Sequence, residues 1–240
     1  MAAGEGTAAV FPRLFILNGV QTMTKLKLWR VAVVFSAVFV CSSQQAPPQA
    51  AWVDLFNGRD LSGWQVRGLG EWSVLDGGVV VGQCDPARPC LPQSWLYTEK
   101  EFGSDFDFSL EYWLRLGGNS GVSIGDRLRA KFAIDPTAGF PTPARSAYEI
   151  NIDNGPERDY DITGSIYKLA KAEAGVRRRR DWNQLLINVR KDTIRVTLNG
   201  RVVAQHPGLP ERPKAGPIGL QLHSPEDVVM FRNVRIREIR

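Results

Sequence analysis

Two short segments of the sequence carry the side chains best suited to transferring protons or binding polar groups. Residues 148–153 alternate between apolar and polar types, which would place Glu149, Asn151 and Asp153 together on one face of a strand. Such a row of oxygen atoms can accept a proton, bind hydroxyl groups or hold a cation. An ordinary solvent-facing strand would show the same alternation, so both interpretations stay open.

The second segment, residues 219–223, places Gly219, Gln221 and His223 on one face of another strand. Histidine can transfer protons near neutral pH. A glycine at this position would let a ligand or a second backbone approach closely. The remaining histidine, His206, precedes a proline in a turn-like segment and is not expected to take part. This second row strengthens the functional interpretation of the first.

Arg232 shares the alternation phase of the apolar residues near the C-terminus, which predicts that its side chain points inward. A buried guanidinium keeps its charge and needs a carboxylate or a ligand as partner. Glu149 and Asp153 are the candidate partners. The alternative is a surface arginine that follows a bulge in the strand.

Two glycine- and proline-rich segments are expected to be loops. Residues 117–121, Gly-Gly-Asn-Ser-Gly, predict a tight turn that could present Asn119 or backbone N–H groups to a ligand. The stretch 125–146 contains three prolines and is long for a loop inside a compact domain, which is often a sign of function.

The whole chain from residue 51 to 240 has the pattern of one all-β domain. Short apolar runs alternate with turn residues along it, which is typical of a sandwich or a barrel. Asn199-Gly200 predicts a hairpin between 194–198 and 201–204, since both central positions of a type I′ turn need a positive φ. The best helix candidate is the short segment 165–175.

The first 50 residues differ from the rest. A basic segment at 23–30, ten apolar or small residues at 31–40 and a polar stretch after them have the order of a secretory signal, too short to anchor in a bilayer. Translation is expected to start at Met23, with 1–22 as an upstream extension and a short linker before the domain. Cys41 could carry a lipid, or cleavage could occur near Ala46 or Ala50. We therefore expect an exported protein, periplasmic or secreted, with membrane contact only through the signal or this lipid.

Cys84 and Cys90 enclose a short loop with two prolines, which in an exported protein predicts a disulfide. Free thiols are the alternative. A zinc site is less favoured because the chain has only two histidines. A divalent metal at the acidic row stays open, but no cofactor is evident.

The formal net charge is +5, and four arginines follow one another at 177–180. No nucleic-acid-binding motif accompanies this charge, so we expect solvated arginines and no nucleic-acid partner. The sequence also lacks the common nucleophile, phosphate-loop and zinc-protease signatures.

Several segments together resemble the 3-keto-disaccharide hydrolase domain family. They occur in the family's order over residues 52–240: 56–64 (FNGRDLSGW), 119–121 (NSG), 148–153 (YEINID), 163–167 (TGSIY), 181–183 (DWN), 198–200 (LNG), 216–223 (GPIGLQLH) and 231–234 (FRNV). The resemblance implies a concanavalin-like jelly-roll sandwich. It also implies cleavage of 3-keto-glycosides, whose C3 ketone acidifies the C2 proton and permits elimination at C1.

Nine side chains are candidates by type for the chemistry that the resemblance implies. Those suited to proton transfer or charge stabilisation are Glu149, Asp153, His223 and Arg232. Those suited to substrate binding are Asn119, Ser120, Asn151, Gln221 and Arg127.

One position departs from the family pattern. Related sequences carry arginine four residues after the Asn-Ser-Gly glycine, where this chain has Gly125, although Arg127 or Arg129 could compensate. This departure keeps two alternatives open: a non-catalytic carbohydrate-binding module of the same fold, and an exported adhesion or scaffold domain. If the latter holds, Glu149, His223 and Arg232 should not meet in one pocket.

Overall fold

The computed structural model describes residues 50–88, 90, 93–135 and 142–239. The predicted signal segment, Met23 and Cys41 lie outside these residues, so export and lipidation stay predictions. Within the described part of the chain, no helix has the length and apolar character that crossing a bilayer requires.

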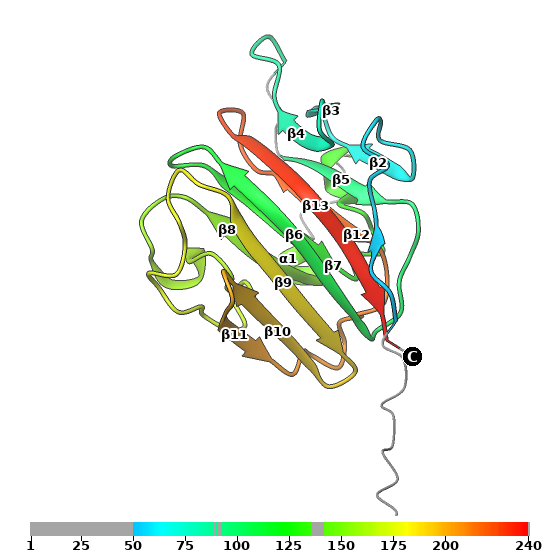
Figure 1. Ribbon diagram of the computed structural model, residues 1–240, viewed down its shortest axis with the longest axis vertical. Coiled ribbons are helices and arrows are strands. Elements are labelled where there is room, and N and C mark those ends of the chain that lie inside the picture. Colours follow the sequence, from blue (N-terminus) through cyan, green and yellow to red (C-terminus); the bar gives the residue numbers. More distant parts are fainter. Residues whose placement is uncertain (1–49, 89, 91–92, 136–141, 240) are drawn as a thin grey trace, which may run out of the picture. The chain divides into compact units, whose positions relative to one another are not determined.

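Two antiparallel sheets form a jelly-roll sandwich, which confirms the predicted fold class. The larger sheet has eight strands in the order β11-β10-β9-β6-β13-β4-β3, with β1 paired to β13. Figure 1 shows β13, β6 and β9 side by side across this sheet. Its strands are β1 (Val53–Asp54), β3 (Glu71–Leu75), β4 (Val79–Gln83), β6 (Phe106–Leu114), β9 (Asn183–Arg190), β10 (Thr193–Leu198), β11 (Arg201–His206) and β13 (Val228–Glu238).

The smaller sheet has five strands in the order β2-β5-β12-β7-β8. Short helical turns lie in the connections on either side of β8. The strands are β2 (Trp64–Arg67), β5 (Ser94–Thr98), β7 (Asn119–Ile124), β8 (Tyr148–Asp153) and β12 (Ile218–Leu222), and the turns are η1 (Lys131–Ala133), α1 (Pro143–Ser146) and η3 (Asp159–Asp161).

Alternation along each strand builds the core between the sheets. On β6, Phe106, Phe108 and Leu110 are buried against the apolar residues of the other sheet, such as Ile150 and Leu220. Each fully buried side chain of this kind stabilises the fold by about 1.5–3 kcal/mol. The polar residues of alternate phase must then face away from this core.

The β10–β11 hairpin forms as predicted, with Asn199 at φ 49° and Gly200 at φ 83°. The predicted helix at 165–175 is wrong. This segment instead forms turns and two isolated bridges, Ile150 to Ile166 and Ile166 to Ala170. The tertiary pairing with β8 outweighs a weak local helix preference, since propensity differences are only a fraction of a kcal/mol per residue.

Candidate functional site

A pocket of about 330 Å³ lies on the face of the five-stranded sheet that is turned away from the core. Part of its lining comes from strands of the sheet and their ends: Gln93, Asn119, Glu149, Asn151 and His223. The rest comes from α1 and the loops after β8: Thr142, Ala144, Arg145, Asp161, Tyr167 and Lys168.

Strand register brings the floor residues together from distant parts of the sequence. On β7, Asn119 pairs with Asp153 and Gly121 pairs with Asn151 of β8. On the other side of β7, β12 pairs antiparallel and continues towards His223. Neighbouring strands lie about 4.8 Å apart, so the polar rows of three adjacent strands form one continuous surface.

Glu149 is the most buried carboxyl of the pocket, with 8% of its surface exposed. Burial raises its pKa to about 7, against hydrogen bonds from the Gln221 side chain and the Ala144 backbone N–H. Gly121 leaves room for this carboxyl, because a Cβ there would lie 3.1 Å from Glu149 Oε1 and 3.2 Å from Gln221 Oε1. Glu149 can therefore both hold and release a proton near neutral pH.

Asp153, a predicted proton-transfer residue, is not among the residues that line the pocket, but it orients the lining residue Asn119. Asn119 Nδ2 donates to Asp153 Oδ2 at 3.2 Å, and the Gly155 N–H donates to Asp153 Oδ1 at 2.6 Å. Partial burial raises the pKa of Asp153, while the Gly155 hydrogen bond and the nearby Arg177 oppose the rise. Asp153 is thus a positioning residue for Asn119.

His223 lines the pocket just after β12, and its Nδ1 lies 2.8 Å from Ser224 Oγ. Burial lowers the pKa of the imidazole below its usual value, with Asp227 and Asp153 acting in the opposite direction. The ring is therefore neutral at neutral pH. With Nδ1 engaged by Ser224, Nε2 is the ring nitrogen left for a ligand.

Asp227, which sequence reasoning missed, connects the Asn119 turn to the His223 loop. Its Oδ1 accepts the Asn119 N–H at 3.1 Å and its Oδ2 accepts the Ser224 N–H at 2.7 Å. Its place just before β13, in a turn rich in small and acidic residues, gave no signal of this role.

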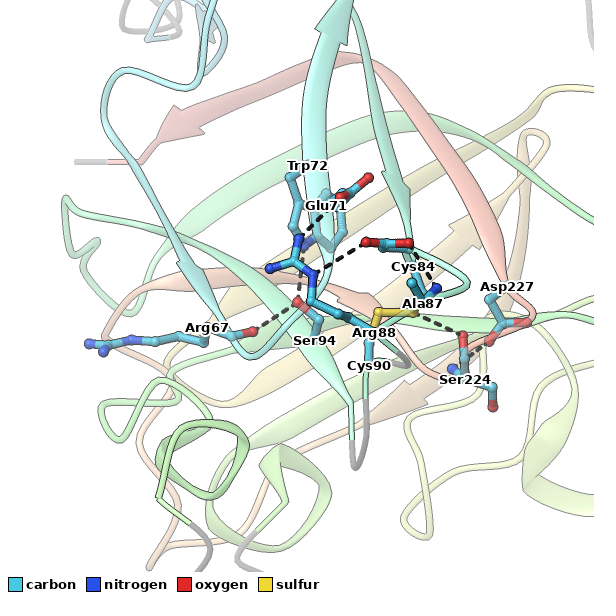
Figure 2. Close-up of a disulfide and its surroundings, with 11 residues drawn as sticks. Arg67, Glu71, Trp72, Cys84, Ala87, Arg88, Cys90, Ser94, Ser224 and Asp227 are labelled. Carbon is cyan, nitrogen blue, oxygen red and sulfur yellow. Dashed lines mark hydrogen bonds and ion pairs between the residues drawn. A yellow bond between two sulfur atoms is a disulfide. The ribbon is translucent and has the colours of Figure 1, made fainter.

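The predicted Cys84–Cys90 disulfide is present and borders the same loop (Figure 2). The two Cα atoms are 5.7 Å apart. Cys84 Sγ lies 3.9 Å from the Ser224 carbonyl oxygen. The disulfide loop therefore contacts Ser224, the residue that follows His223.

Arg232 is not part of the pocket, and the prediction that it points inward is wrong. Its Nη2 lies 2.7 Å from Glu111 Oε2 on β6, and its guanidinium lies 4.1 Å from the centre of the Trp182 ring. A register shift in β13 follows Arg232, with Asn233 at φ 52°. This bulge breaks the alternation, so Arg232 faces outward from the eight-stranded sheet.

Three predicted binding residues also lie outside the pocket lining. Gln221 is 1% exposed, and its Nε2 donates to Oε1 of the lining residue Gln93 at 3.3 Å. Ser120 is buried on the core-facing phase of β7, where its hydroxyl donates to the Gln221 carbonyl at 2.7 Å. Arg127 is exposed in the loop after β7. Arg129 cannot replace it, because its Nη2 donates to the Glu99 carbonyl and to Glu101.

Two glycines serve packing instead of ligand access. A Cβ at Gly219 would lie 2.4 Å from the Tyr97 ring, so this glycine makes room for Tyr97. Gly125 has φ +74°, and a Cβ there would lie 2.1 Å from the Pro213 carbonyl oxygen. This backbone cannot carry an arginine at position 125.

The arginine run at 177–180 is not uniformly solvated. The Arg177 side chain is 5% exposed and donates to the carbonyls of Asp153 and Gly155. These hydrogen bonds fix the backbone at the end of β8.

The remaining lining residues were missed by sequence reasoning. Arg145 and Lys168 carry positive charge into the pocket, and Tyr167, Asp161, Gln93 and Thr142 complete it. Arg145 lies near the end of the 125–146 stretch, in α1, and Lys168 lies in the segment that was expected to be helical. Only the motif containing Tyr167, among the family-like segments, could have drawn attention to this region.

Within the described residues, two buried oxygen atoms at the site lack a hydrogen-bond donor: Asn119 Oδ1 and Gln221 Oε1. A buried acceptor without a donor costs about 1–3 kcal/mol, so such atoms are usually satisfied by a ligand or by water. Across the same part of the chain, no group of three or more His, Cys, Asp and Glu side chains is placed to hold a metal ion.

Comparison with known proteins decides the family. Residues 51–237 match the 3-keto-alpha-glucoside-1,2-lyase-like domain. The chain belongs to this family. The match confirms the resemblance seen in the sequence, and membership in this family supports a function on carbohydrate. A search of the sequence against curated proteins found no match.

Three solved structures share the fold of this domain. A predicted glycosyl hydrolase from Parabacteroides distasonis is 24% identical with a TM-score of 0.59, over 79% of this chain and 100% of the other. The carbohydrate-binding module CBM66 from Bacillus subtilis is 16% identical with a TM-score of 0.50, over 78% and 100% of the two chains. A Bacillus subtilis protein with a galectin-like fold is 10% identical with a TM-score of 0.54, over 81% and 97%.

Proposed function

We propose that this domain cleaves the glycosidic bond of 3-keto-glycosides by removing the C2 proton and eliminating the C1 substituent. One observation carries the proposal: Glu149, Asn119 and His223, from three adjacent strands of a domain of this family, line the same pocket. Arg232 does not join them, so Glu149, His223 and Arg232 do not all meet in one pocket, which is the arrangement expected for an adhesion or scaffold domain. The support for a carbohydrate site is the meeting of Glu149, Asn119 and His223.

The reaction needs one base and one acid on the pocket floor. The base takes the proton from C2, and the C–H electron pair delocalises onto the C3 oxygen as an enolate. When the enolate collapses, a C1–C2 double bond forms and the C1–O bond breaks, so that the aglycone oxygen leaves with a proton from the acid. Water can then add across the double bond, which gives net hydrolysis.

We assign the base to His223 and the acid to Glu149. The lowered pKa of His223 leaves a free lone pair on its ring at neutral pH. The pKa of Glu149, about 7, keeps a large fraction of this carboxyl protonated at the same pH. Asn119 and Asn151 would bind the sugar hydroxyls, and the unpaired oxygen of Asn119 suits this role.

The test is turnover of a 3-keto-glucoside by the purified protein, with and without added divalent metal. We expect release of the aglycone and loss of the C2 proton. Intact 3-keto-glucoside after prolonged incubation under both conditions would sink the proposal.

A second candidate is a carbohydrate-binding module without catalytic activity. The observation that favours it is Gly125, whose backbone excludes the arginine that the family resemblance leads us to expect there. Recovery of intact keto-glycoside from a tight complex would support this candidate, and rapid turnover would exclude it.

A further inference from the structure

The proposed elimination places negative charge on the C3 oxygen, and the pocket must stabilise that charge. Donors aimed at a developing oxyanion are often the largest single contribution to catalysis. The floor offers mainly acceptors, namely the Glu149 carboxyl, the Asn119 carbonyl oxygen and neutral His223. Positive charge must therefore come from elsewhere in the lining.

Arginines near the sheet do not supply it. Arg127 is exposed and lies outside the pocket lining. The guanidinium of Arg129 donates to Glu101, and that of Arg177 donates to backbone carbonyls. Among the lining residues, the basic side chains besides His223 are Arg145 and Lys168.

We propose that Arg145 and Lys168 together stabilise the enolate oxygen that forms when the C2 proton is removed. This inference rests on the proposed function. It gives the pocket an oxyanion site built from α1 and the loop after β8, in place of an arginine on the sheet.

Arg145 follows Ala144 in α1, a turn whose backbone is fixed to Glu149. The Ala144 N–H donates to the Glu149 carboxyl, and the Ala147 N–H closes the turn onto the Pro143 carbonyl at 2.9 Å. From outside the pocket, Arg212 Nη1 donates to the Ala144 carbonyl at 2.9 Å. Arg145 makes no ion pair within the described residues, so its guanidinium is available to a ligand.

Lys168 is fixed to the same strand by a different segment. The Tyr167 N–H donates to the Glu149 carbonyl at 2.8 Å, next to the bridge between Ile150 and Ile166. Lys168 has φ 60°, and its Nζ lies 5.5 Å from the centre of the Tyr167 ring. Like Arg145, it forms no ion pair with another described residue. Both cations are thus attached to β8, the strand that carries the proposed acid.

The experiment measures kcat, KM and the exchange of the C2 proton with deuterated water, using a 3-keto-glucoside. The variants are Arg145→Gln, Arg145→Lys and Lys168→Met. The matched controls are Arg127→Gln and Lys171→Met, which alter exposed residues outside the pocket lining. Far-ultraviolet circular dichroism and thermal melts confirm that each variant is folded.

Loss of one oxyanion donor typically lowers kcat by about 10²–10³-fold, so we expect Arg145→Gln and Lys168→Met to fall in this range. KM should change little and proton exchange should slow with kcat. Arg145→Lys should recover part of the loss, and the two controls should match the wild type.

Two results would overturn the inference while leaving the proposed function intact. In the first, the wild type turns over and both variants keep its kcat. In the second, only KM rises, which would mean that the cations bind the ground state equally well. A wild type without turnover would instead remove the proposed function, and this inference with it.

Discussion

At the scale of single residues, Glu149 gains its chemistry from its surroundings. A glutamate in water has a pKa of about 4.3 and is ionised at neutral pH. Burial on β8 raises the pKa of Glu149 to about 7, although the hydrogen bond from Gln221 opposes the rise. The same residue type on an exposed strand could not serve as an acid at this pH.

The assignment of Glu149 as acid predicts a dependence on the leaving group. Glu149→Gln cannot donate the proton that an alkoxide needs, but a nitrophenolate can leave without one. We expect kcat/KM of Glu149→Gln to fall by about 10²–10⁴-fold on a methyl 3-keto-glucoside, and far less on the nitrophenyl analogue. Steady-state rates on both substrates provide the measurement.

His223→Gln is the companion variant, because a base is needed with either leaving group. Its rate should fall on both substrates alike. If Glu149→Gln lost the same factor on both, Glu149 would not be the acid.

At the scale of elements, β7 shows how pairing overrides local sequence. Residues 117–121 predict a tight turn, yet β7 already begins at Asn119 and pairs with β8 and β12. Glycine weakens an isolated strand, but Gly121 is needed here so that Glu149 and Gln221 fit above it. The turn thus shrinks to the residues before Asn119.

Asp227 joins two elements of the site, which predicts a specific pH effect of Asp227→Asn. The carboxylate raises the pKa of His223, although burial outweighs it. Its removal should lower that pKa further. Because the base must be neutral, the acidic limb of the kcat/KM profile should move to lower pH.

The same variant weakens the hydrogen bonds that hold Asn119 and Ser224, so kcat/KM at neutral pH should drop by up to about 100-fold. Asp76→Asn, in the exposed turn between β3 and β4, is the control. A lower rate with no shift of the acidic limb would reduce Asp227 to a purely structural role.

At the scale of the whole molecule, one buried ion cluster connects three strands of the eight-stranded sheet. Asp107 on β6, with 2% of its side chain exposed, lies 2.5 Å from Arg237 on β13 and 2.7 Å from Arg190 on β9. Burial opposes the charged form, but hydrogen bonds from Arg237, Asn188 and Arg190 outweigh it and lower the pKa of Asp107. Two guanidinium groups would remain without this partner if it were removed.

Asp107→Asn should therefore destabilise the fold by about 3–5 kcal/mol at neutral pH, measured by urea unfolding. Because the folded pKa lies below the unfolded value of about 3.9, the stabilisation is complete above that pH. It is lost as the pH falls through the folded pKa. The difference between wild type and variant should shrink in acid, while the exposed control Asp54→Asn should match the wild type throughout. An equal difference at all pH values would show that the charge of Asp107 is not responsible.

The sequence by itself determined the fold class, the β10–β11 hairpin, the Cys84–Cys90 pairing and the polar rows of β8 and β12. These features depend on alternation, turn chemistry and short-range closure, which act between residues near in the chain. The tertiary structure decided which polar rows lie side by side, and it turned Arg232 outward at the bulge that follows it. It also decided that Asp227 connects the Asn119 turn to the His223 loop, and that Arg145 and Lys168 line the pocket. Strand order, bulges and burial arise from contacts between segments that are distant in the chain. The local pattern of residues within one segment therefore does not reveal them.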